Sequence, residues 1–283
     1  MFEQFNQETI YLVSMPFVIL FIALEIYLSY KEQTENYTKK DTLTNIYFAL
    51  LNFSLDMLMK GFSFFVLGFF YIHRFFNFEI GVIYWLACFL IQDFLYYVHH
   101  CVDHKSRVFW AVHATHHNSE FFNLTTGFRS PVFQPLYRYI FFVPMAIAGF
   151  HPLHIMFAYT VNQVWGTLVH TKKINKLGVL EYFMVTPSHH RVHHASNVKY
   201  LDKNMGMVFI IWDKIFGTFQ AEEDDYEEIK FGLTYPIEDK GPINIIFHEW
   251  KAIYKDASQA GISFKDRLKY VFYNPAWKPS KNI

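Results

Sequence analysis

The sequence is poor in cysteine and in net charge. Its 283 residues include only two cysteines, Cys88 and Cys101, so no disulfide framework is expected. Lys and Arg (25) balance Asp and Glu (25), which gives no basic surface for nucleic acid. A Gly-rich phosphate loop, a dinucleotide fingerprint and an internal repeat are also missing from the sequence. What the sequence has in excess is apolar residues and histidine.

Long apolar runs indicate a membrane protein, since 52% of the residues are hydrophobic and 20% are aromatic. Residues 10–30, 43–72 and 78–98 are each long enough to cross a bilayer. A fourth region, residues 139–169, contains Pro144, Gly149 and Pro152, which predict a break into two antiparallel segments. We therefore expect an all-α integral membrane protein with about four to five transmembrane helices. Asp56 and Lys60, one helical turn apart in the second run, are predicted to pair inside the bundle, although both could instead sit near a cavity.

Basic residues predict the orientation in the membrane. No Lys or Arg precedes the first apolar run, whereas Lys31, Lys39 and Lys40 follow it. The positive-inside rule then puts the N-terminus outside and this loop in the cytoplasm. Later crossings return the chain to the same face near residue 99 and near residue 170. The expectation is a multi-pass protein of a bacterial inner membrane or of the endoplasmic reticulum, with a helical cap on the cytoplasmic face.

Eleven of the fifteen histidines stand in three clusters and at one isolated position. The clusters have the forms HxxxH, HxxHH and HxxHH, and spacings of three or four residues put imidazoles on one face of a helix. The candidate ligands are His100 and His104, then His113, His116 and His117, then His190, His193 and His194, with the isolated His170. His99 and His189 point about 100° away from their ligand-spaced neighbours and are predicted to be outer or packing residues.

Eight or nine imidazoles are too many for one metal ion, so the sequence predicts a pair. Imidazole suits zinc, copper, iron and nickel, and reduced iron pairs are the ones that activate dioxygen. Beside apolar helices, such a site predicts oxygen-dependent lipid oxidation. Metal-bound histidines usually donate their second N–H to an outer group. Asp93, two helical turns before His100, is the preferred carboxylate, followed by Asp103, Glu120 and Asp202.

Two other interpretations remain open at this point. A membrane zinc-binding or metal-transport protein would also explain the histidines, although transporters place ligands near the membrane midplane. Imidazole sites favour copper and zinc over iron, so recombinant protein could carry zinc. A desaturase would share the ligands and the oxidant of a hydroxylase.

The histidine boxes resemble those of the fatty acid hydroxylase and sterol desaturase superfamily. Further motifs resemble its alkylglycerol monooxygenase branch: DFLYY (93–97), NLTT (123–126), TPS (186–188), DKN (202–204) and IWDKIFGTF (211–219). The resemblance covers residues 93–237 and implies that the eight box histidines bind two iron ions catalytically, with His170 as a ninth ligand. It also implies a lipid substrate, dioxygen and an electron donor of pterin, ferredoxin or cytochrome type. The branch uses tetrahydrobiopterin to hydroxylate the ether-linked carbon of alkylglycerols, whereas other members act on sterols or fatty acids.

The sequence divides into three parts of a single predicted domain, residues 1–283. Residues 1–92 carry the N-terminal membrane helices, residues 93–220 the histidine boxes, and residues 221–283 an amphipathic tail. The acidic run at 222–228 is typical of a solvated loop. Aromatic residues among lysines near the end predict either a helix at the membrane interface or a cap over the site.

Overall fold

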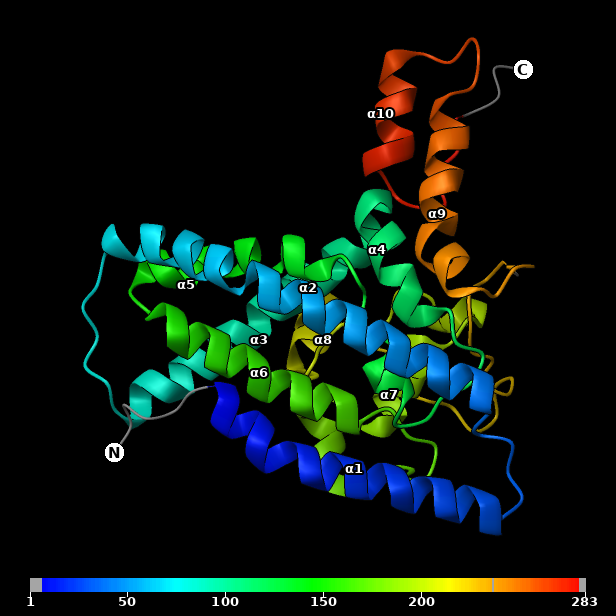
Figure 1. Ribbon diagram of the computed structural model, residues 1–283, viewed down its shortest axis with the longest axis horizontal. Coiled ribbons are helices and arrows are strands. Elements are labelled where there is room, and N and C mark those ends of the chain that lie inside the picture. The colour runs from blue at the N-terminus through cyan, green and yellow to red at the C-terminus, as the bar shows by residue number, and fades with distance from the viewer. Residues whose placement is uncertain (1–6, 236, 280–283) are drawn as a thin grey trace.

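The computed structural model describes residues 7–235 and 237–279, which form helices and, apart from two isolated bridges, no β-structure (Figure 1). The α-helices are α1 (Gln7–Lys31), α2 (Lys39–Ile72), α3 (Val82–Lys105), α4 (Arg107–His117), α5 (Val143–Ala148), α6 (Pro152–Leu168), α7 (Pro187–His194), α8 (Ile211–Phe216), α9 (Pro242–Ala257) and α10 (Phe264–Phe272). Short 3₁₀ turns connect several of them. The predicted all-α class is confirmed.

Three helices are long and apolar enough to cross a membrane, within Thr9–Lys31, Lys39–Ile72 and Val82–Lys105. They run antiparallel to one another in chain order (Figure 1). Their outer faces expose large apolar side chains, for example Leu12, Leu58 and Ile83. In water such a surface would be unfavourable, whereas acyl chains cover it without cost. The chain is therefore an integral membrane protein, and the count of four to five crossings stays a prediction.

The fourth apolar region breaks at the predicted place. The 3₁₀ turn Arg138–Phe142 leads directly into α5, which is capped by Gly149. Helix α6 then begins at Pro152. Gly149 has a φ of 123°, and a Cβ at this position would lie 2.2 Å from the carbonyl oxygen of Phe76. Only glycine fits both the backbone conformation and this close approach.

The predicted pairing of Asp56 with Lys60 is wrong. Asp56 instead forms an ion pair with Arg138 across the bundle, whereas Lys60 is exposed. The Arg138 guanidinium lies over the rings of Tyr139 and Tyr159, at 5.2 and 4.8 Å from their centroids. A buried guanidinium needs a carboxylate more than an exposed ammonium does, and this decides the partner of Asp56. The carboxylate also lines a cavity, as the alternative interpretation allowed.

The C-terminal hairpin of α9 and α10 projects away from the three long helices (Figure 1). Helix α9 packs against α4, which carries the second histidine cluster. The buried Arg107 fixes this contact. Its Nε donates to Glu249 at 2.7 Å, and its Nη1 lies 2.8 Å from Oδ2 of Asp256. The hairpin thus covers one side of the histidine-bearing region. The division into parts ending at residues 92 and 220 stays a prediction.

Candidate metal centre

Local structure explains how three distant clusters meet. The first cluster ends α3, and the chain turns at Ser106 directly into α4, which carries the second. Helix α7 is capped by Thr186, whose side chain accepts the N–H of His189, and it has Pro187 in its first turn. Both residues favour helix initiation, so the third cluster forms a helix of only eight residues.

The nine predicted ligands divide into two groups, and within each group the candidate ligand atoms lie within 4.8 Å of one another. The five-histidine group is His100, His104, His113, His117 and His193, and the four-histidine group is His116, His170, His190 and His194. All are buried except the partly buried His116. Each cluster contributes to both groups except the HxxxH box, and the isolated His170 completes the smaller one.

Backbone carbonyls fix the orientation of several imidazoles. The Nδ1 atoms of His100 and His193 lie 2.8 and 3.0 Å from the carbonyl oxygens of Met205 and Lys203. In the other group, His116 and His170 reach the carbonyls of Arg129 and Gly166 at 3.0 and 2.7 Å. Carbonyl oxygens only accept, so each Nδ1–H donates and each Nε2 presents a lone pair.

These lone pairs face one another inside the groups. Nε2 of His170 lies 3.4 Å from Nε2 of His116, although neither atom carries a proton to share. Nε2 of His104 and of His193 are buried without a hydrogen-bond partner. Converging lone pairs repel unless a cation lies between them. The donor sets therefore fit one transition-metal ion per group, and all-nitrogen sets are suited to iron, copper, zinc or nickel.

Burial keeps seven of these imidazoles neutral. Desolvation lowers the pKa of His113, His117, His170, His190, His193 and His194 well below the ordinary value, and it lowers the pKa of His116 to about 4. Neighbouring imidazoles reinforce the effect, since two protonated rings would repel. A neutral imidazole is the form that binds metal, so these seven histidines are ready as ligands at pH 7.

Two of the predicted outer carboxylates reach the histidines. Oδ1 of Asp202 lies 3.2 Å from Nδ1 of His104. Oδ2 of Asp103 lies 3.3 Å from Nε2 of His99 and 3.6 Å from Nδ1 of His113. His99 also stacks on Phe141, at 4.5 Å between ring centroids, and belongs to neither group.

His189 and Glu120 are placed away from the ligand sets. Nε2 of His189 lies 3.2 Å from Glu181, and its Nδ1 lies 3.2 Å from the carbonyl of Met184. Glu120 is exposed and bonds Lys240 at the surface. The two residues thus lie outside the groups, where His189 packs and Glu120 is solvated.

Asp93, the preferred outer carboxylate, contacts no histidine. Its oxygens accept the N–H groups of Val208 and Phe209 and the indole N–H of Trp212, at 2.9 to 3.1 Å. Seven residues rise about 10.5 Å along a helix, so Asp93 and His100 share a face without touching. Asp93 instead holds the segment just after Met205, whose carbonyl orients His100.

Sequence reasoning missed the backbone that orients the ligands. Asp202 and Asn204 both have positive φ, at 56° and 54°, and this turn directs the Lys203 carbonyl toward His193. Asp213 accepts the N–H groups of Met205 and Gly206 at 2.7 and 2.8 Å and so anchors the turn. The DKN and IWDKIFGTF motifs mark these residues, but spacing alone does not reveal which carbonyl meets which imidazole.

Arg129 was also missed. It is almost fully buried, donates to the carbonyl of Thr115 and to the side chains of Asp41, Asn45 and Asn118, and offers its own carbonyl to His116. The available signal was a pair of polar residues, Asp41 and Asn45, one turn apart at the start of an apolar run. Such a pair indicates a buried polar partner.

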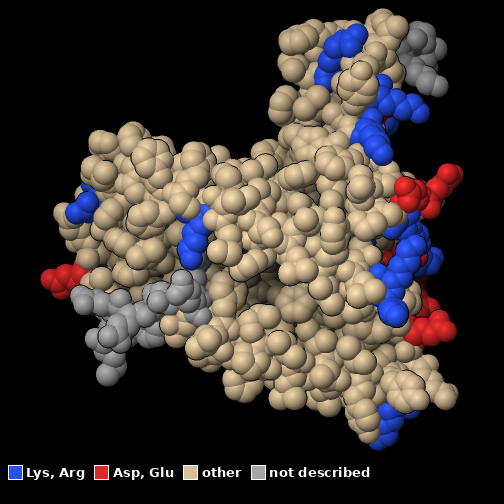
Figure 2. All heavy atoms as spheres, in the orientation of Figure 1, with Lys and Arg blue, Asp and Glu red and all other residues tan. Residues whose placement is uncertain are grey.

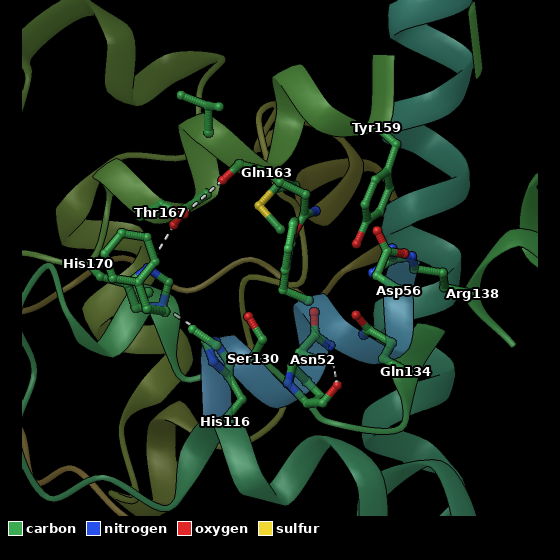
Figure 3. Close-up of a pocket in the computed structure, with 18 of the residues that line it drawn as sticks. Asn52, Asp56, His116, Ser130, Gln134, Arg138, Tyr159, Gln163, Thr167 and His170 are labelled. Carbon is green, nitrogen blue, oxygen red and sulfur yellow. Dashed lines mark hydrogen bonds and ion pairs between the residues drawn. The ribbon is translucent and has the colours of Figure 1, made fainter. Parts of the chain in front are cut away.

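A cavity of about 220 Å³, here called the membrane cavity, lies between α1, α2 and α6 and ends at the histidines. Figure 2 shows this face of the molecule hollowed at its centre, among mainly uncharged residues. The cavity reaches His100 and His113 of the larger group and His116, His170 and His190 of the smaller one. Figure 3 shows Asn52, Ser130, Gln134, Gln163 and Thr167 around it, with Ser130 and Thr167 on the side of His116 and His170 and Gln134 on the side of Asp56 and Arg138.

Comparisons with known proteins agree with this geometry. The pattern that defines the family described as Fatty acid hydroxylase matches residues 85–218. Alkylglycerol monooxygenase of Homo sapiens is 41% identical over 200 residues, which are 70% of this chain and 43% of that protein. Alkylglycerol monooxygenase of Danio rerio is 33% identical over 276 residues, 94% of this chain and 59% of that protein.

More distant relatives act on other lipids by name. Lathosterol oxidase of Homo sapiens is 28% identical over 136 residues, 47% of this chain and 43% of that protein. The chain spans less than two thirds of the length of these relatives. No solved structure gives a significant match. The predicted family is confirmed: through its residues 85–218 the chain belongs to the fatty acid hydroxylase superfamily, and the relatives named above are a monooxygenase and an oxidase.

Proposed function

We propose that this protein is a diiron monooxygenase that inserts one oxygen atom into a C–H bond of an ether lipid beside its glycerol headgroup. The observation that carries the proposal is the membrane cavity, which joins an apolar, lipid-facing bundle to both histidine groups. The five-histidine and four-histidine groups would each hold one iron ion. When bound, this iron pair supplies the site at which dioxygen is reduced and activated.

The polar lining of the membrane cavity favours a carbon close to a headgroup. Asn52 and Gln134 supply amides, and Ser130, Tyr159 and Thr167 supply hydroxyls. A mid-chain carbon of a fatty acid would put only methylene groups against these polar side chains, which would lose their water without a replacement partner. A 1-alkylglycerol instead places two hydroxyls and an ether oxygen within a few bonds of the reacting carbon.

The reaction balances with two electrons from a donor. The ether R–CH₂–O–R′, dioxygen, two protons and two electrons give R–CH(OH)–O–R′ and water. The hemiacetal then breaks its C–O bond, its hydroxyl proton passes to the departing oxygen, and an aldehyde and glycerol result. The chain's own side chains bind the headgroup, hold the ether carbon at the end of the cavity and exclude bulk water.

The cytoplasmic orientation also belongs to this proposal. Figure 2 shows the Lys, Arg, Asp and Glu side chains gathered mainly at one end of the molecule. The start of α2 and the segment after His170 carry lysines, among them Lys39, Lys40 and Lys173. Since basic loops stay in the cytoplasm, the metal centre would face the cytoplasm of a bacterial cell or of the endoplasmic reticulum.

The test uses the full chain in nanodiscs, loaded with iron and supplied separately with an alkylglycerol, a fatty acid and a sterol. Each reaction receives dioxygen and a tetrahydropterin, a ferredoxin or a cytochrome system, and mass spectrometry detects the products. We expect aldehyde and glycerol from the alkylglycerol, and no product from His116→Ala or His193→Ala. Oxygenation of only the fatty acid or the sterol would contradict the headgroup argument and support a sterol or fatty acid hydroxylase or desaturase. No oxygenated lipid from any substrate would contradict the oxygenase and favour a metal-binding or metal-transport protein.

Gln163 provides a sharper probe, because its amide lines the membrane cavity beside the apolar Val164. Replacing Gln163 by Leu removes one hydrogen-bonding group at similar volume and should raise KM for the alkylglycerol about tenfold, the equivalent of one hydrogen bond of ~1.4 kcal/mol. Val164→Leu is the matched control and should leave the KM for the alkylglycerol unchanged. Equal KM values for both variants and the wild type would contradict headgroup binding at this position.

A further inference from the structure

A second cavity, here called the distal cavity, also reaches the metal centre, and more charged residues line it than line the membrane cavity. Its volume is about 530 Å³, and it lies between α4, the segment after α7, and the C-terminal hairpin. It touches His104, His117 and His193 of the five-histidine group and His194 of the other. None of these four lines the membrane cavity. The two cavities therefore approach the same centre on different imidazoles.

The lining of the distal cavity is not suited to an acyl chain. Arg107, Glu249 and Asp256 form a linked ion-pair network on one wall, and Lys255 and Lys278 add positive charge. Thr234, Asn274 and Asp202 supply further donors and acceptors. Moving an apolar molecule here would remove water from charged groups without replacing its hydrogen bonds.

Two aromatic residues give the distal cavity a place for a flat molecule. The Trp110 ring lies 5.3 Å from the ring of His104 and 5.6 Å from that of His117, measured between centroids. Tyr235 lies on the same wall, with its hydroxyl donating to Glu249 at 2.8 Å. A planar ring stacked on Trp110 would thus be one side chain away from two members of the five-histidine group.

We propose that the distal cavity binds the electron donor, a small water-soluble reduced heterocycle with hydrogen-bonding edges, while lipid occupies the membrane cavity. This inference rests on the oxygenase function proposed above, which needs two electrons and two protons per oxygen inserted. A reduced heterocycle DH₂ supplies both as it becomes D, so the lipid C–H, dioxygen and DH₂ give the lipid alcohol, water and D. The volume lies in the range of ~300–1,000 Å³ found for small-molecule sites. A protein donor would need no cavity of this size beside the histidines.

Substitution of Ala252 on α9 can fill the distal cavity while every charged residue and every histidine in its lining is kept. Ala252 lines the distal cavity, whereas its neighbour Lys251 is exposed and lines neither cavity. Ala252→Trp adds an indole inside the cavity, and Lys251→Trp adds the same group outside it. Zinc-loaded full-length protein in nanodiscs is titrated with 6-methyltetrahydropterin and with reduced flavin mononucleotide, and binding is measured by anaerobic equilibrium dialysis.

We expect at least one probe to bind the wild type and the Lys251→Trp variant equally, and Ala252→Trp to weaken that binding about tenfold or more. In the iron-loaded protein the KM for that donor should rise by the same factor while the KM for lipid stays constant. Metal content and a single turnover after reduction with dithionite should be unchanged in Ala252→Trp. Equal binding by both variants, or binding of neither probe to the wild type, would overturn the proposal. If donor binding behaves as expected but dithionite-reduced wild type oxygenates no lipid, the proposed function fails and the donor site stands.

Discussion

The unequal sizes of the two histidine groups predict unequal effects of removing one ligand. His170→Ala leaves three imidazoles in the four-histidine group, whereas His104→Ala leaves four in the five-histidine group. Four ligands complete a closed metal site, and three leave it open. Apparent binding energies of ~10–16 kcal/mol for four-ligand zinc sites correspond to roughly 2.5–4 kcal/mol per ligand, or about two to three orders of magnitude in Kd.

The assay is metal retention. Wild-type and variant proteins are loaded with zinc or ferrous iron, dialysed against a chelator of intermediate affinity, and analysed by mass spectrometry for metal per chain. We expect about two ions in the wild type and in His104→Ala, and about one in His170→Ala. Both residues are buried to a similar degree, so the cavity left by truncation is matched. His99→Ala, in a buried histidine outside both groups, controls for loss of any imidazole and should retain two ions.

Two results would refute this reasoning. Loss of one ion from His104→Ala as readily as from His170→Ala would show that the five imidazoles do not form one redundant set. Retention of two ions by His170→Ala would show that the isolated histidine is not needed for metal binding.

Three further predictions concern stability. Burial lowers the pKa of the imidazoles on α4 and α7, so below pH 6.5 the unfolded metal-free chain binds more protons than the folded chain. The unfolding temperature of the metal-free protein should therefore fall from pH 7 to pH 5. Equal unfolding temperatures at the two pH values would contradict buried neutral histidines. Glu249→Leu leaves the buried Arg107 short of a partner and should destabilise the α4–α9 contact by ~3 kcal/mol, measured by hydrogen exchange, whereas Glu120→Ala in an exposed pair should cost less than ~1 kcal/mol. Gly149→Ala should lower the unfolding temperature strongly because its Cβ meets a carbonyl oxygen, whereas Gly61→Ala, with open space around it, should not.

Much of the fold and of the ligand sets could be predicted from periodicity and spacing. The apolar runs predict the three long helices, and Gly149 predicts the break before α6, because both signals are local. Histidine spacing placed imidazoles on common helix faces. It could not assign members to groups: adjacent residues such as His116 and His117 belong to different groups, since they point in different directions around α4.

The errors arose where a long-range contact overrode a local one. Asp56 has Lys60 one turn away but pairs with Arg138, 82 residues later in the chain. Asp93 was assigned to His100 by shared helix face, but its carboxylate is used by the backbone of residues 208 and 209. In both cases the deciding partner is a buried donor in a loop or turn, and no periodicity encodes its position.

The outer partners of the histidines explain why the centre lies where helices end. Within a helix each carbonyl already accepts an N–H, so free carbonyls for imidazoles occur only in turns and at helix ends. Met205 and Lys203 lie in a turn. Gly166 lies in the last turn of α6, where its carbonyl accepts the Nδ1–H of His170. Such backbone is tolerated at membrane depth only where protein surrounds it, and this favours the position near a membrane face that we propose for the centre. Lipid headgroups lie at the depth that we propose for the centre, so a carbon beside a headgroup would reach it with its acyl chain still in the bilayer. A mid-chain carbon would have to leave the bilayer first, and this favours the ether-linked carbon as the site of oxidation.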